Sequence, residues 1–79
     1  MFPVQISSRL RVYIDMVEDT FPNRGGYYCR IFGDDTMDFP RGEFTISRNE
    51  IRGYDTDKKT AEMRGRMIAA NKAKTYFTR

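Results

Sequence analysis

The sequence predicts an α+β fold, in which a small antiparallel sheet of three to four strands carries one C-terminal helix packed on one face. Two observations lead to this prediction. Short apolar–polar alternations, separated by Gly, Pro and Asp, fill residues 1–47, whereas the following segment is rich in Ala, Lys, Arg, Met and Glu and has no proline. Because the chain has 79 residues, we expect one small domain over 1–79.

The first predicted strand covers residues 9–17, where apolar side chains recur at every second position. The alternating set is Leu10, Val12, Ile14 and Met16. Residues 8–21 also fit the period of a helix. A helix here would place Arg9 and Arg11 at its positive end and Glu18 and Asp19 at its negative end, so the charges favour a strand.

The next predicted elements are a second strand and a hairpin. After turn residues at 21–26, the segment 27–32 alternates, with Tyr27, Cys29 and Ile31 on one face. Residues 36–39 and 43–47 then read as two short strands. Pro40-Arg41-Gly42 between them matches a type I turn.

Two helical segments are expected in the last third of the chain. Ser47 and Glu50 have capping-box spacing, which predicts a short turn that ends near Gly53. Asp55-Thr56-Asp57 offers N-cap residues for a helix from about 57 to 76. Small residues spaced by four would let this helix lie close against a sheet or a partner. They are Ala61, Gly65, Ala69 and Ala73.

Composition removes most catalytic chemistry. The chain has no histidine and one cysteine, so Ser–His and Cys–His pairs, histidine metal sites and zinc–thiolate clusters are excluded. We therefore expect no enzyme, no cofactor and no metal site. Cys29 on an alternating strand indicates an inert core thiol. Asp34, Asp35 and Asp38 are interpreted as a solvated turn.

The same composition bears on location. A single cysteine forms no internal disulfide, and no segment resembles a signal peptide or a membrane span. We expect a cytoplasmic protein that has no membrane partner.

Charge and aromatic residues give the functional clue. Residues 1–47 have five basic and seven acidic side chains, and residues 48–79 have nine and four. On the sheet face opposite the helix, an aromatic–basic platform is expected. Its members are Arg9, Arg11, Tyr13, Tyr28, Arg30 and Phe32. The alternative is that residues 1–4 cover Tyr28 and Phe32. A second basic set is expected on the helix, namely Arg64, Arg66, Lys72 and Lys74.

These sets predict a non-enzymatic binding module that docks on nucleic acid or on a nucleic-acid–protein complex. The alternative is a protein-binding inhibitor or adaptor of a host defence or regulatory complex, acting as a monomer or homodimer. A helix-turn-helix is disfavoured, because with Gly53 in the turn polar residues would occupy its core positions. The overall profile is typical of small accessory proteins of phages and mobile elements. Changing Arg9 and Arg11 together to Glu is predicted to abolish binding at the platform.

Overall fold

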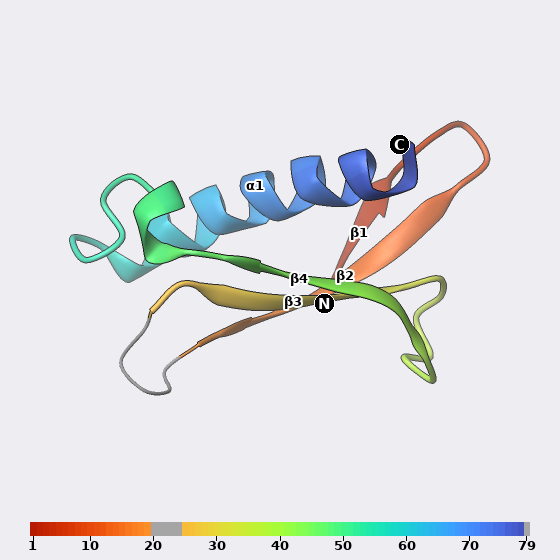
Figure 1. Cartoon of the computed structure of the whole chain (residues 1–79), viewed down its shortest axis with the longest axis horizontal. Helices are drawn as coiled ribbons and strands as arrows, with labels where there is room; N and C mark the ends of the chain where they lie inside the picture. The colour runs from red at the N-terminus through yellow and green to blue at the C-terminus, as the bar shows by residue number, and fades with distance from the viewer. Residues whose placement is uncertain (20–24, 79) are drawn as a thin grey trace.

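The computed structural model describes residues 1–19 and 25–78. Four strands form one antiparallel sheet in the order β1-β2-β3-β4, and a long helix covers one of its faces (Figure 1). The elements are β1 (Phe2–Gln5), β2 (Arg11–Glu18), β3 (Tyr27–Phe32), β4 (Pro40–Ile46), the short 3₁₀ helix η1 (Arg48–Glu50) and α1 (Lys58–Thr78). The predicted α+β fold is therefore confirmed.

The central strands follow the predicted alternation. Residues 11–18 form a strand and not a helix, and Ile14 and Met16 stand opposite Ile31 and Cys29 of β3. Val12, Ile14, Cys29 and Ile31 are fully buried on the side of α1. Burial of an aliphatic side chain stabilises a fold by about 1.5–3 kcal/mol, so this face forms the main part of the core.

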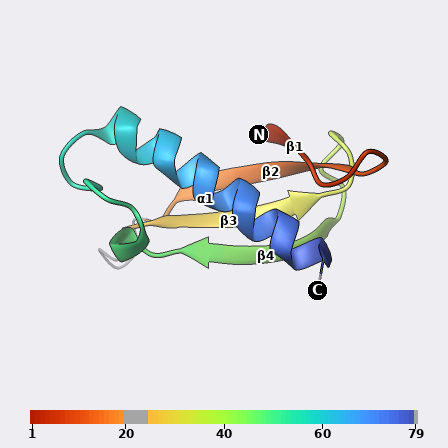
Figure 2. The ribbon, with the colours of Figure 1, turned by 90° about the horizontal axis from the view of Figure 1, so that it is seen from above.

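Helix α1 crosses the strands diagonally (Figure 2). Ala61, Ala69 and Ala73 are buried against the sheet. A Cβ atom at Gly65 would lie 3.2 Å from Cε2 of Tyr27. The small residues spaced by four therefore bring the helix close to its own sheet.

Strand β1 was not predicted. It pairs with β2, placing Phe2 opposite Ile14 and Val4 opposite Val12 on the core side. The alternative in which residues 1–4 cover Tyr28 and Phe32 is wrong, because β1 lies next to β2 and away from β3.

The hairpin predicted around Pro40-Arg41-Gly42 is also wrong. These residues begin β4, and the segment 33–39 connects β3 to β4. Within this connection the Asp34 carboxylate accepts a hydrogen bond from the backbone N–H of Thr36, and Met37 adopts φ 59°. The chain therefore turns before Pro40. Proline is tolerated there because it starts an edge strand.

Both helices start at their predicted caps, although η1 ends at Glu50 and not near Gly53. The Ser47 backbone N–H donates to the Glu50 carboxylate at 2.8 Å, as expected for η1. The Asp57 carboxylate accepts hydrogen bonds from Lys59 N–H at 3.2 Å and from Thr60 Oγ1 at 2.6 Å. Asp57 therefore caps α1, which runs two residues beyond the predicted end at 76.

Candidate nucleic-acid interface

The sheet face away from α1 carries the predicted aromatic–basic platform, but its charges are balanced. Nη2 of Arg30 lies 2.6 Å from Oδ2 of Asp15 on β2, and Glu43 of β4 stands opposite Arg30 on its other side. The hydrogen bond to Asp15 is the main reason that the pKa of Arg30 is raised. Arg30 therefore sits between two carboxylates.

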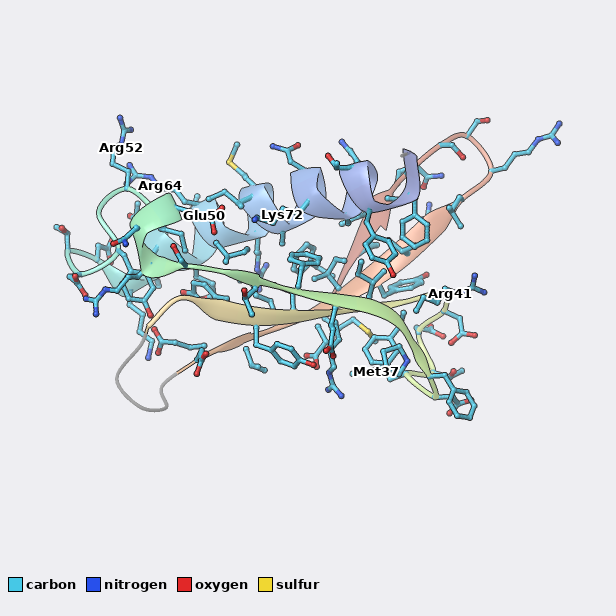
Figure 3. All side chains as sticks on the ribbon, viewed as in Figure 1. Met37, Arg41, Glu50, Arg52, Arg64 and Lys72 are labelled. Carbon is cyan, nitrogen blue, oxygen red and sulfur yellow. The ribbon has the colours of Figure 1, made fainter. Side chains whose placement is uncertain are left out.

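The aromatic members of the platform are also occupied. The hydroxyl of Tyr28 donates to the Glu43 carboxylate, which raises the pKa of Tyr28. Only 2% of Phe32 is exposed, and the Arg30 guanidinium lies 5.4 Å from its ring centroid. Met37 lies on this same side of the sheet (Figure 3). Phe32 is therefore unavailable for stacking, whereas Tyr13 and Tyr28 remain partly exposed.

The strand register spreads the remaining platform residues. Tyr13 stands opposite Phe32, whereas Tyr28 stands opposite Val17 towards the other end of β2. Arg11 begins β2, and its Nε donates to the side-chain oxygen of Gln5 at 3.1 Å. Arg9 lies in the exposed turn before β2. The structure does not bring the six residues into one cluster.

The two layers of the molecule differ in charge. Among the described residues, the segment through residue 46 has four basic and seven acidic side chains, and residues 47–78 have eight and four. The first segment forms the sheet and its loops, and the second forms η1 and α1 (Figure 1). The excess of positive charge therefore lies on the helical layer.

Half of the cations in the helical layer are held in ion pairs. Arg66 pairs with Glu62 at 3.1 Å, and Lys72 reaches Glu50 of η1 at 3.0 Å (Figure 3). Lys58 and Arg48 pair with Glu18 and Asp55. The hydrogen bond from the Ser47 backbone N–H is the main reason that the pKa of Glu50 is lowered. The hydrogen bond from the Lys72 side chain lowers this pKa further.

The other half have no carboxylate partner within residues 1–19 and 25–78. They are Arg52, Lys59, Arg64 and Lys74. Nη1 of Arg64 donates to the Arg52 carbonyl, and the two arginine side chains lie together beside the first turns of α1 (Figure 3). Arg52 and Lys59 were outside the predicted site. Arg52 had no sequence signal beyond the general basic excess after residue 47, whereas Lys59 belongs to the basic segment predicted as the long helix.

A basic stripe runs along the solvent side of α1, and its part from Arg66 onward lies beside β1. It consists of Lys59, Met63, Arg66, Met67, Ala70 and Lys74. Two of its members are unusually exposed for apolar residues, Met63 at 67% and Met67 at 69%. At 1.5 Å per residue, the stripe is about 22 Å long. Adaptable methionine surface is typical of binding faces.

A groove of about 370 Å³ separates the stripe from β1. Phe2, Pro3, Val4 and Gln5 form one wall, and Arg66, Met67, Ala70 and Lys74 form the other. The Arg66 guanidinium lies over the Phe2 ring at 5.4 Å from its centroid. This groove combines apolar surface with two cations.

The remaining groups that could be reactive are the Cys29 thiol and the side chains that could bind a metal ion. Cys29 is fully buried, and burial raises the pKa of its thiol to about 12. Across the described part of the chain, no group of three or more His, Cys, Asp or Glu side chains is arranged to hold a metal ion. No helix in that part has the length and apolar character required to span a membrane.

Comparisons of the chain with protein-family models, curated proteins and solved structures gave no match.

Proposed function

We propose that this protein is a non-enzymatic binding module that docks on nucleic acid, alone or within a nucleic-acid–protein complex, through its helical layer. The observation that carries the proposal is the separation of charge between the two layers. Phosphates are attracted by a surface with excess Lys and Arg, and the acidic sheet layer turns the opposite side of the protein away from them.

The cations without carboxylate partners are the main proposed contacts. Lys59 and Lys74 lie on the basic stripe, and Arg52 and Arg64 extend the positive surface near the start of α1. Such side chains can neutralise phosphates without first breaking an ion pair. Arg66 and Lys72 must share their charge with Glu62 and Glu50, so we assign them smaller phosphate contributions.

The platform on the sheet is given no role in phosphate binding. Arg30 is paired, Tyr28 is bonded to Glu43 and Phe32 is buried.

A cytoplasmic location is part of the proposal, because the single cysteine, Cys29, is unpaired and buried.

Protein binding is a second candidate, favoured by one specific observation. Phe39 is 84% exposed in the loop that also contains Asp34, Asp35 and Asp38. An exposed aromatic ring among carboxylates fits a basic protein surface that has an apolar pocket. In that case a polyanion such as heparin competes by binding the basic surface of the partner and not by binding this protein.

Fluorescence anisotropy with labelled single- and double-stranded DNA and RNA tests the leading proposal. Titrations at ~50 and ~200 mM salt are expected to show binding that weakens steeply, because bound phosphates release counterions. Absence of binding to all four oligomers at ~50 mM salt would overturn the proposal and favour the protein-binding candidate.

A further inference from the structure

We infer that the protein prefers single-stranded nucleic acid to duplex, with one unstacked base in the groove between β1 and α1. This inference rests on the proposed function and assigns its ligand class. The sugar–phosphate backbone follows the basic stripe while the base turns towards β1.

The groove has the surface that a base requires. It is an open groove of about 370 Å³, so a bound base would keep one side exposed to solvent. Phe2, Pro3 and Val4 on one side and Met67 and Ala70 on the other supply apolar walls. A duplex keeps its bases stacked inside the helix, so only an unpaired base gains contact with these walls.

Arg66 supplies a planar group for stacking. Its guanidinium is held over the Phe2 ring and bonded to Glu62, yet 54% of its side chain is exposed. Guanidinium planes stack on unpaired bases in single-stranded recognition. Since Phe2 and Glu62 already restrict Arg66, the stacking surface is positioned before the ligand arrives.

Lys74 and Lys59 are placed to follow the backbone on either side of the base. Lys74 lines the groove and lies eight residues from Arg66, about 12 Å along the helix axis. Lys59 lies seven residues before Arg66, about 10 Å in the other direction. Neither has a carboxylate partner among the described residues.

The larger groove, between α1 and β4, fits this ligand less well. Its volume is about 450 Å³, but Glu43 lines it and its one cation, Lys72, is paired with Glu50. A phosphate there meets a carboxylate and no unpaired cation. The arrangement of charges therefore favours the groove beside β1 as the binding site for the strand.

Equilibrium titrations with one mixed-sequence 12-nucleotide DNA strand and its duplex, both labelled, test the inference at ~50 mM salt. We expect the single strand to bind roughly tenfold more tightly, the gain from one stacked base. Replacing a base near the middle with 2-aminopurine is expected to give a change in its fluorescence on binding, because the base leaves its neighbours.

Two variants locate the base. Arg66→Lys keeps the charge and removes the guanidinium plane, and we expect it to weaken single-strand binding severalfold with little effect on duplex. Arg48→Lys is the matched control, because Arg48 also pairs with a carboxylate, Asp55, and lies over an aromatic ring, Tyr54, but does not line the groove. Ala70→Leu fills the groove and is expected to weaken single-strand binding roughly tenfold. If this variant does not fold, the result for Arg66→Lys tests the position of the base.

The outcomes separate the inference from the proposed function. Equal affinity for strand and duplex, with no difference between Arg66→Lys and Arg48→Lys, would overturn the inference and leave phosphate binding intact. If neither these DNA oligomers nor the corresponding single- and double-stranded RNA bind at ~50 mM salt, both proposals fail together.

Discussion

Gly26 shows how a single position restricts the fold. Its φ is 79°, and a Cβ atom there would lie 2.2 Å from the Ile46 carbonyl oxygen and 3.0 Å from the Arg48 nitrogen. Both neighbours are backbone atoms that the sheet and η1 hold in place. A side chain therefore adds a main-chain clash to the cost of a left-handed conformation.

We expect Gly26→Ala to lower the free energy of unfolding by about 2–4 kcal/mol, measured by urea denaturation. Gly25→Ala is the matched control. It also has a positive φ, 72°, but its nearest neighbour is the Tyr54 ring at 3.1 Å, so about 1–2 kcal/mol is expected. Equal losses for the two variants would contradict the assignment of the additional cost to the main-chain contact.

Cys29 predicts how stability depends on alkaline pH. Burial raises the pKa of its thiol from 9.0 to about 12, so the unfolded chain loses this proton at lower pH than the folded chain. The contribution of the protonated thiol to the free energy of unfolding is therefore complete below about pH 9 and is lost as the pH rises towards 12. Burial also raises the pKa values of Tyr27 and Tyr54, which act in the same direction.

The free energy of unfolding is therefore expected to fall as the pH rises from about 9 towards 12, with a smaller decline in Cys29→Ala. Ellman's reagent is expected to leave the folded thiol unmodified at pH 8 and to modify it in urea. Rapid modification of the folded protein would show that the thiol is accessible.

At the scale of the element, the start of α1 depends on one carboxylate. Asp57 accepts hydrogen bonds from Lys59 and Thr60, and these bonds lower its pKa. Asp57→Ala is expected to lower the free energy of unfolding by about 1 kcal/mol in thermal or urea unfolding. Asp55→Ala removes only an exposed ion pair with Arg48, so its cost is expected to be smaller, about 0–1 kcal/mol. A larger loss for Asp55→Ala than for Asp57→Ala would show that Asp57 is not the residue that caps α1.

Elements with a clear period were predictable, and those decided by distant contacts were not. Strands β2 and β3 and helix α1 followed their alternation or composition. Strand β1 has four residues, too few for a pattern, and depends on pairing with β2. The turn chemistry of Pro40–Gly42 was overridden because Tyr76 of α1 packs over Gly42, where a Cβ would lie 2.6 Å from its hydroxyl oxygen.

The candidate site was predictable only as a composition. Basic residues on α1 were evident from the sequence, but the pairing of Lys72 with Glu50 depends on how η1 packs beside the helix. Alternation placed Phe32 on the correct face of β3 without revealing that it is buried. The groove beside β1 was missed together with β1 itself.

At the scale of the whole molecule, the sequence halves of opposite charge become two layers. The sheet, with its acidic loop, and the helical layer present different surfaces to solvent (Figure 1). A polyanion approaching this molecule is attracted to one side and repelled from the other. We therefore predict that the position of a lost charge, and not only its amount, decides the effect on binding.

The most direct test compares two double variants that lose the same charge from different layers. Lys59→Gln with Lys74→Gln removes two stripe cations, and Arg9→Gln with Arg11→Gln removes two from the sheet layer. Anisotropy titrations with a labelled DNA strand from ~50 to ~200 mM salt, on variants shown to be folded by circular dichroism, measure both affinity and salt dependence. We predict that the helix variant binds markedly more weakly and that its slope of log K against log salt is shallower by about 1.4, two contacts at ~0.7 each, while the sheet variant stays close to the parent protein. Equal losses in both variants, or a greater loss in the sheet variant, would contradict the helical layer as the binding surface.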